Sequence, residues 1–468
     1  GTSLKASVSA RYLFGGAMTK RPLAWSLTRA ATDVLPAKIT DVFDSETWAF
    51  GYRPDQRRDA PAFTRIAGAT VPLDASSAFA STLTSEKGVD AAYEYTFEGD
   101  VEDLSRQHIA NRASVVVHPA PWYIGLKRPG YMVTAGKGAT TEVVAAGLDG
   151  AVVPNVKVTV SLLRVQYISA RRAQGGGFYE WESTRREIPS GEWTVTTSAA
   201  PVPLAVPVPE GGGYVLRATA TDAAGHVTRT DVPFYADGEG YTAWERFGHN
   251  RIELTPAKKS LVPGDTAKIL IKSPWETATA LVTVEREGIR SVRRFALTST
   301  QQTIDIPVTA RDIPNVFVSV LLVKGRTSKP NDAQATAPDG AGGTDPADPG
   351  KPAFKLGYTE LTVSDVSKQL TVNVTADKPE YRPAKQAKVN VVVKDHAGKG
   401  TASEVTLWAV DAGVLALTGY EAPNVREAVW VKKALQLAGL VKATKRGKHR
   451  RRRPRRPDRR CQPGDVPG

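Results

Sequence analysis

Histidine and carboxylate side chains carry most metal and acid–base chemistry, and in this chain they form no recognisable motif. The six histidines stand at positions 108, 118, 226, 249, 396 and 449, none with the paired spacing of a metal-binding helix. The sequence also lacks a G-x-S-x-G nucleophile turn, a P-loop and a dinucleotide-binding fingerprint. We therefore expect a non-enzymatic protein with no catalytic, cofactor-binding or metal-ligating residues and no cofactor.

Asp411 is the acidic residue best suited to catalysis, because it lies within an apolar run. Burial raises the pKa of a carboxyl group, as a general acid or base requires. A carboxylate at a strand kink, accepting backbone N–H groups and followed by the flexible Gly413, explains the position better. We favour this structural interpretation.

Two other features resemble ligand sites. Residues 174–179 read QGGGFY, but no helix follows whose positive end could bind phosphate, so we interpret them as a hairpin loop. Aromatic residues near strand ends could form a sugar-binding platform, although such residues are more often core plugs between modules. They are Trp122, Tyr123, Trp244, Trp275 and Trp408.

Cysteine content and charge exclude further classes of protein. The single cysteine is Cys461, so the chain before it can hold neither a disulfide framework nor a zinc–thiolate site. The net charge of +14 arises largely from 12 Lys and Arg residues between 442 and 460. Residues 1–440 carry 50 basic and 46 acidic side chains. We therefore expect no nucleic-acid binding by the folded part.

Apolar and polar residues alternate along most of the chain, which is typical of half-buried β-strands. Helical periodicity is nearly absent, and turn sequences such as Pro263-Gly264-Asp265 separate the runs. A length of 468 residues predicts three to four domains. We predict an all-β fold of tandem immunoglobulin/fibronectin-like seven-stranded β-sandwiches, with the last one incomplete and a disordered basic tail.

The strand pattern divides into four units. They cover residues 1–111 (N-terminally truncated), 112–247, 248–367 and 368–430, and a tail covers 431–468. Residues 53–85 of the first unit read as irregular. The fourth unit offers strands at 369–376, 387–394 and 404–417, which are too few to close a sandwich, so its apolar faces would lie open.

The third unit carries the clearest strand pattern. Its seven strands begin near Arg251, Ala267, Ala280, Ser291, Gln302, Asn315 and Gly357. Residues 327–352 interrupt the last two strands with Pro, Gly, Asp and Ala and almost no large apolar side chain. Such a stretch cannot bury enough surface to become ordered, so we predict a disordered insertion and the first site of proteolysis.

A shift of 120 residues aligns the third unit with the fourth. Pro263 then falls on Pro383, Lys268 on Lys388 and Ile269 on Val389. We interpret this as one module used twice, although any two segments with a proline turn between strands share some likeness. Gly264 suits a turn position with positive φ, whereas the second copy has Ala384 there.

The fourth unit also carries a family resemblance. Residues 381–383 (YRP), 395–398 (DHAG) and 410–420 (VDAGVLALTGY) resemble a macroglobulin-like domain of bacterial alpha-2-macroglobulins. Earlier stretches are similar to the preceding macroglobulin domains: ARYLFG at 10–15, VVHP at 116–119, and SPW at 273–275 with ALVTVER at 280–286. The resemblance covers about residues 1–425 and would make the four units consecutive macroglobulin-like domains.

The resemblance implies an endopeptidase inhibitor that traps proteases. In that family a protease cuts an exposed bait segment, the molecule rearranges, and a Cys–Gln thioester captures the protease. Units like these form the rigid shell. The thioester motif is absent, because Cys461 is followed by Gln462-Pro463-Gly464 rather than Glu-Gln. We expect the bait segment in the fourth unit beyond its break, so this chain alone should not inhibit.

Partners and location follow from the same resemblance. Proteases, through the full-length protein, are the expected partners, together with cell-envelope components, in a periplasmic or envelope-attached setting. The chain begins within strand-like sequence, without a signal peptide, so we expect its start to be a cut edge. The alternative function is a cell-surface array of Ig-like modules that binds carbohydrate or protein.

The basic tail has two interpretations. Its Arg-, Lys- and Pro-rich sequence would suit an electrostatic arm for nucleic acid or an anionic membrane, solvated in either case. It also resembles out-of-frame translation of a GC-rich coding sequence, and the family match stops abruptly near residue 424. We favour this second, non-native origin.

Overall fold

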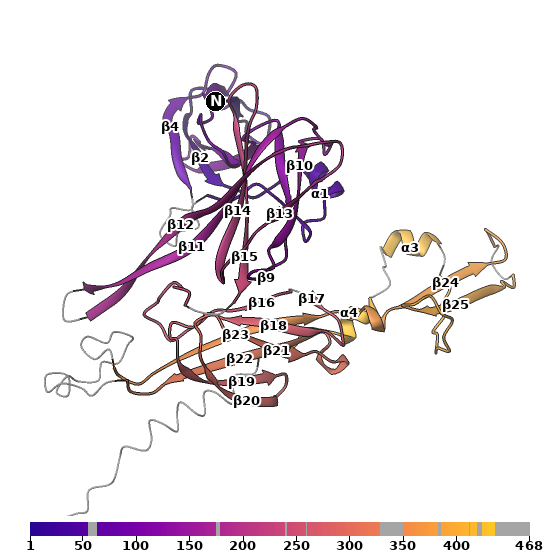
Figure 1. The fold of residues 1–468 in the computed structure, drawn as a ribbon. Helices are drawn as coiled ribbons and strands as arrows, with labels where there is room; N and C mark the ends of the chain where they lie inside the picture. Colours follow the sequence, from indigo (N-terminus) through magenta and orange to yellow (C-terminus); the bar gives the residue numbers. More distant parts are fainter. Residues whose placement is uncertain are drawn as a thin grey trace, which may run out of the picture.

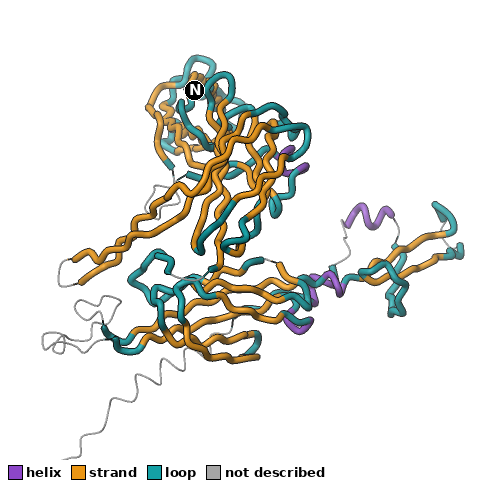
Figure 2. Tube along the Cα trace, viewed as in Figure 1, coloured by secondary structure: helices purple, strands orange, loops and turns teal. Residues whose placement is uncertain are grey.

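The computed structural model describes the chain except for residues 55–62, 175–177, 239–240, 259, 328–349, 382–384, 411, 419–423 and 436–468. Strands dominate this part of the chain, with few short helices (Figure 2). The strands form three sandwiches and a separate two-stranded ribbon, which lies beyond the third sandwich (Figure 1). The predicted all-β fold is confirmed.

The first sandwich packs a two-stranded sheet on a four-stranded one. The strands are β1 (Ser3–Ser9) and β5 (Ala78–Thr84), and β4 (Thr64–Pro72), β2 (Pro22–Ala31), β6 (Tyr93–Glu102) and β7 (His108–Val117), each sheet in that order. Leu23, Leu73 and Val101 fill its core.

Two predictions for this unit were wrong. Residues 53–85 hold the strands β4 and β5 rather than irregular chain, and the predicted boundary at 111/112 falls inside β7. Most side chains of β4 are exposed, so its sequence carries little of the alternation that marks a half-buried strand.

The second sandwich packs a four-stranded sheet on a five-stranded one. The first sheet has the order β13 (Val202–Val206), β10 (Ala139–Gly147), β8 (Trp122–Lys127) and β3 (Trp48–Phe50). The second has β12 (Phe178–Thr196), β11 (Lys157–Gln174), β14 (Gly212–Thr221), β15 (Val227–Asp237) and β9 (Met132–Thr134). Ile124, Leu162 and Leu216 lie fully buried between the sheets.

A segment expected in the first unit belongs to the second sandwich. Strand β3 pairs with β8, and helix α1 (Ala37–Val42) places Ile39 against Tyr123 and Val144 on the outer face of that sheet. Strands β8 and β10 are therefore buried on both faces, which accounts for the unbroken burial from Trp122 to Leu126. The predicted first unit, residues 1–111, wrongly included this segment, because nothing near Trp48 in the sequence indicates that its partner strand lies in the second unit.

Strands β11 and β12 form one long hairpin, in which a single strand runs from Phe178 to Thr196. Pairing of β14 with β11 ends at Val165. Beyond that point only two strands remain, and the hairpin projects away from the sandwich as a ribbon (Figure 1).

The third sandwich contains all seven predicted strands and one more, the short β17. One sheet holds β16 (Leu254–Pro256), β18 (Thr266–Ile271) and β21 (Thr303–Pro307). The other has the order β17 (Ser260–Leu261), β23 (Ala353–Val363), β22 (Asn315–Lys324), β19 (Ala278–Glu285) and β20 (Ile289–Leu297), with the 3-10 helix η1 (Ala310–Asp312) before β22. Strands β22 and β23 pair from Asn315–Thr362 to Lys324–Ala353, so the insertion interrupts a hairpin, but its residues 328–349 lie outside the described residues.

The ribbon follows the 3-10 helix η2 (Val366–Lys368) and contains β24 (Leu370–Ala376) and β25 (Val389–Asp395). The third strand predicted at 404–417 was wrong: α3 (Ala412–Thr418) occupies its end, and α4 (Val425–Val429) follows. Ala and Leu are strong helix formers, and a short apolar run does not separate helix from strand by periodicity. No helix in the described residues is long and apolar enough to cross a membrane.

The pairing register supports the internal repeat. In the third sandwich Leu254 pairs with Ile271, and 120 residues later Val374 pairs with Val391. The hydrogen bond that closes each hairpin is also shared, from Ala257 N–H to Lys268 O at 2.8 Å and from Asp377 N–H to Lys388 O at 3.1 Å. Gly264 has the expected positive φ of 103°.

The two copies differ in what covers them. Ile269 is completely buried by the second sheet of its sandwich, whereas the equivalent Val389 is 38% exposed. The apolar face of the ribbon carries Leu370, Val372 and Val374, each at least half exposed, as predicted for an incomplete unit.

We predict that Ile269→Ala destabilises the third sandwich by about 2–4 kcal/mol, because it leaves a cavity in a closed core. The matched control Val389→Ala should change stability by less than about 0.5 kcal/mol, because little buried surface is lost. Scanning calorimetry of both variants measures the difference, and equal shifts would contradict the assignment of an open face to the ribbon.

Candidate functional site at the junctions between the sandwiches

Potentially catalytic side chains remain dispersed in the structure. The described residues contain no group of three His, Cys, Asp or Glu that could hold a metal. His108 contacts Asp100 at 3.1 Å, His226 contacts Asp222 at 2.8 Å, and the half-buried His118 contacts Tyr123 at 2.8 Å. Burial lowers the pKa of His118. Asp411 lies outside the described residues.

Most of the five aromatic residues are structural. Trp122 belongs to the core of the second sandwich, and Tyr123 packs beneath the segment that carries α1. Trp244 bridges the second and third sandwiches, and Trp275 packs on the core of the third. Trp408, in contrast, is 54% exposed. The described residues thus favour core plugs over a sugar-binding platform.

Charged side chains concentrate at the junction of the first two sandwiches. Asp231 on β15 receives two hydrogen bonds from Arg229 at 2.9 and 2.6 Å and two from Arg217 at 2.9 Å. The Arg229 guanidinium lies 3.9 Å from the centre of the Tyr52 ring. Tyr52 in turn donates to Asp90 of the first sandwich. A continuous polar chain therefore joins the two units.

Burial and neighbouring charges have opposite effects on the pKa of Asp231. Burial alone would raise the pKa of Asp231, but the hydrogen bonds and positive charges of Arg229 and Arg217 outweigh it and lower that pKa. Burial, together with the Asp90 carboxylate, raises the pKa of Tyr52. Asp231 is thus held ionised and Tyr52 protonated.

Backbone groups within the second sandwich, next to this junction, are also paired. The buried hydroxyl of Thr230 donates to the Ile124 carbonyl at 2.6 Å and accepts the Gly51 N–H at 2.8 Å. One side chain on β15 thus holds both β8 and the segment after β3. A buried hydroxyl with both roles filled favours one arrangement of the three segments.

The linker between the second and third sandwiches is buried against the third. The Thr242 N–H donates to the Thr300 hydroxyl at 2.7 Å, and the Thr242 hydroxyl donates to Gln301 Oε1 at 2.8 Å. The Trp244 indole N–H donates to the Thr300 carbonyl at 2.6 Å. Gly211 of the second sandwich approaches so closely that a Cβ there would lie 2.6 Å from the Gln301 amide. A larger residue at Gly211 would therefore require the Gln301 side chain to move.

Cationic side chains cover the polar ends of this junction. Lys272, 9% exposed, donates to the Tyr235 hydroxyl at 2.7 Å and to Glu253 at 2.7 Å. Its ammonium lies 4.1 Å from the Tyr235 ring centre and 5.5 Å from that of Trp244. The Lys272 ammonium is shielded from water, where contacts with aromatic rings are stronger than at the surface, whereas the Glu253 side chain is 65% exposed.

The long hairpin also reaches the linker. Ser183 on β12 donates to the Arg246 carbonyl at 3.0 Å and accepts its N–H at 3.1 Å. The Arg246 guanidinium lies 5.0 Å from the centre of the Trp181 ring. The projecting part of the hairpin is therefore anchored to the linker on one side.

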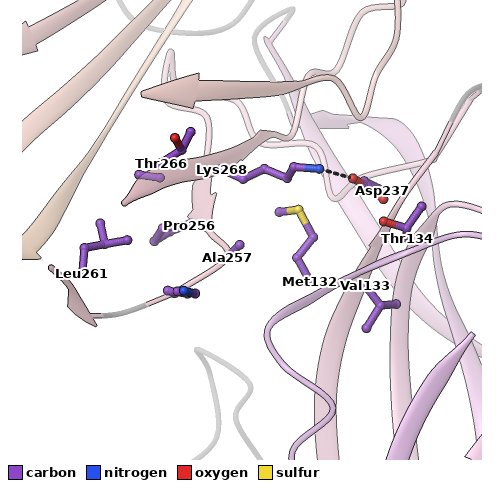
Figure 3. A pocket seen from close by; sticks show the side chains of 11 residues that line it. Met132, Val133, Thr134, Asp237, Pro256, Ala257, Leu261, Thr266 and Lys268 are labelled. Carbon is purple, nitrogen blue, oxygen red and sulfur yellow. Dashed lines mark hydrogen bonds and ion pairs between the residues drawn. The ribbon is translucent and has the colours of Figure 1, made fainter. Parts of the chain in front are cut away.

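A cavity of about 240 Å³ lies between the second and third sandwiches. Its walls come from Met132, Val133 and Asp237 on one side and Leu261 and Lys268 on the other, and Figure 3 shows the Lys268–Asp237 ion pair across it. The pair spans 2.8 Å, and the hydrogen bond to Asp237 raises the pKa of Lys268. One carboxylate and one ammonium do not make a metal site. We therefore interpret this cavity as a gap in the packing between the two sandwiches.

Sequence reasoning missed these junction residues. Tyr52, Thr230 and Thr300 carry no motif, and each acquires its role only when distant segments meet. Trp244 gave a partial signal, because an aromatic residue between two predicted units indicated a plug.

Models of known families match the second and third sandwiches. A model described as bacterial macroglobulin domain 6 matches residues 125–237, and one described as alpha-2-macroglobulin bait region domain matches 252–417. An alpha-2-macroglobulin homolog from Nostoc is 23% identical over 440 residues, covering 93% of this chain and 22% of the relative. The chain belongs to the bacterial alpha-2-macroglobulin family. An alpha-2-macroglobulin from Xylella fastidiosa is 26% identical over 338 residues, covering 70% of this chain and 19% of the relative.

The chain thus spans about a fifth of the length of these curated alpha-2-macroglobulins. The native conformation of alpha-2-macroglobulin from E. coli aligns with 95% of the chain and 29% of that structure, at 18% identity and a TM-score of 0.41. The bait region domain match covers the third sandwich as well as the start of the fourth unit, whereas the sequence placed the bait segment in the fourth unit alone.

We predict that Asp231→Asn destabilises this alpha-2-macroglobulin chain by about 2–3 kcal/mol at pH 7, because Arg217 and Arg229 each lose one of their two carboxylate partners. Since the folded state lowers the Asp231 pKa, its contribution is full above the ordinary carboxyl pKa of about 3.9 and is lost as pH falls below it. The stability gap between wild type and variant should therefore close between about pH 4 and pH 2.

Thermal unfolding at several pH values measures that gap, with Asp33→Asn, at an exposed position, as the control that leaves stability unchanged. A gap that stays constant down to pH 2 would contradict the assigned role of Asp231.

Proposed function

We propose that these residues form part of the structural shell of an alpha-2-macroglobulin-type endopeptidase inhibitor that traps proteases. One observation carries the proposal: two macroglobulin family models fall on successive sandwiches, and part-buried polar contacts, Lys268 with Asp237 and Lys272 with Tyr235, join those same sandwiches. A shell that confines a protease must hold its units at fixed angles. The role proposed for this chain is therefore mechanical, with proteases as partners and a periplasmic or envelope-attached location.

Covalent capture is not among the roles we propose for these residues. A thioester needs a cysteine followed shortly by Glu-Gln, and the only cysteine, Cys461, precedes Gln-Pro-Gly. We propose that the full-length protein carries capture chemistry elsewhere.

We further propose that residues 327–352 are where a protease first cuts. The bait region domain match includes them, and their sequence of Pro, Gly, Asp and Ala offers little to bury. Strands β22 and β23 on either side stay paired from Asn315–Thr362 to Lys324–Ala353. A cut in this segment would therefore leave the third sandwich closed.

The alternative function, an array of Ig-like modules that binds carbohydrate or protein, would suit an extended chain with solvated linkers. The buried linker at Thr242 and Trp244 favours the shell. The exposure of Trp408 is the one feature of the aromatic set that suits a binding array.

Limited proteolysis with an elastase-type enzyme tests the proposal. Trypsin is unsuitable because both lysines of the segment, Lys329 and Lys351, precede proline, whereas alanines recur through it. We expect the first cuts between residues 327 and 352, and we expect the two products to elute together in size-exclusion chromatography.

A variant with residues 331–348 replaced by a short Gly-Ser linker without alanine should resist the first cut and is the matched control. First cuts inside strands β19 to β22, or products that separate at once, would contradict the proposal. Retention on a glycan array would favour the alternative.

A further inference from the structure

The segment after the ribbon returns to the third sandwich. Asn424 caps α4 by accepting the Glu427 N–H at 3.3 Å, and α4 lies between that sandwich and the ribbon (Figure 1). Trp430 packs against the core of the third sandwich, and the Lys368 ammonium lies 5.7 Å from its ring centre. The tail predicted from 431 therefore begins with exposed residues of which Lys432 and Lys433 contact the third sandwich.

The side-chain amide of Asn315 forms two hydrogen bonds with the backbone of this segment. Asn315 Nδ2 donates to the Lys433 carbonyl at 2.8 Å, and Asn315 Oδ1 accepts the Lys433 N–H at 2.9 Å. Asn315 is 1% exposed and is held at the start of β22. Both bonds go to main-chain atoms, so they recognise an extended peptide whatever its side chain at that position.

Three ion pairs also join the segment to the third sandwich and the turn that follows it. Lys432 lies 3.2 Å from Glu360, Lys433 lies 3.2 Å from Glu287, and Arg426 lies 3.5 Å from Asp365. All three cations come from the segment, and all three carboxylates come from the third sandwich or the turn that follows it. Exposed pairs contribute little stability singly, but their matched signs select one kind of segment and one direction.

The rest of the segment makes few contacts. Val425, Val429 and Val431 are 68%, 64% and 56% exposed. The attachment thus depends on one aromatic anchor, one amide and a charged rim, which is the anatomy of a peptide recognition site rather than of a packed core. A segment held in this way can be replaced by another of the same chemistry.

We propose that the end of the third sandwich is a docking face for a basic peptide. The docking face comprises Glu287, Asn315, Glu360, Asp365 and Lys368. Its ligand is a segment with a tryptophan followed, after one residue, by two lysines, and residues 424–433 of the chain itself fill the face in cis.

The proposal does not depend on the protease-trap function. The docked segment follows the ribbon in the chain, so its occupancy also sets how closely the ribbon lies to the sandwich. A second segment of the same kind would compete with it.

Competition in trans tests the docking face on the full chain. A fluorescently labelled, acetylated and amidated peptide of residues 424–433 is titrated and followed by anisotropy. Wild-type chain, whose face is filled, should bind it at least tenfold more weakly than Trp430→Ala, in which the cis segment has lost its anchor. Adding Asn315→Ala to Trp430→Ala should reduce binding about tenfold.

A charge swap keeps the test valid if Asn315→Ala perturbs the fold. In the Trp430→Ala background, Glu287→Lys with Glu360→Lys should reject the native peptide and bind a peptide in which both lysines are glutamate. Equal binding of a scrambled peptide, equal binding by wild type and Trp430→Ala, or no recovery with the swapped peptide would each overturn the proposal.

Discussion

At Thr242 the linker between the second and third sandwiches is buried, and this imposes the constraint on which the arrangement depends. A buried N–H without a partner costs about 1–3 kcal/mol, so the Thr242 amide has to meet an acceptor. It meets the hydroxyl of Thr300, on the third sandwich. Trp244 adds a second bond to the same residue. Because Thr242 and Trp244 bond to Thr300 of the third sandwich and Arg246 bonds to Ser183 of the second, the linker is fixed to both units rather than free to act as a hinge.

The second constraint is that the apolar face of a sheet has to be covered. The two copies of the internal repeat differ in whether this is met. Strands β16–β18 and β24–β25 share register and closing hydrogen bond, yet Ile269 is fully buried while Val389 is 38% exposed. A two-stranded ribbon buries too little surface to be stable alone in water. In the described residues, the docked segment that carries Trp430 is what ties this part of the chain to the third sandwich.

The sequence predicted most where strands alternate and neighbours in sequence pair, as in the third sandwich. It could not predict that residues 37–50 leave the first unit to cover β8 and β10, because that burial comes from a partner far along the chain. Strand β4 was missed because its side chains are mostly exposed, and 404–417 was misjudged because an isolated apolar run does not reveal whether a strand partner exists. The junction residues Tyr52, Thr230 and Thr300 were not predictable from type or spacing. Their function is created by the packing of units that each fold around a separate core.

Hydrogen–deuterium exchange of the linker amides tests the central claim most directly. If Thr242 is held by the third sandwich, its N–H should exchange as slowly as the amides of strand β19, since opening it requires breaking the core of that sandwich. Exchange of Thr242 at the rate of an unstructured peptide, with β14 and β19 still protected, would show that the two sandwiches move independently and would contradict the account.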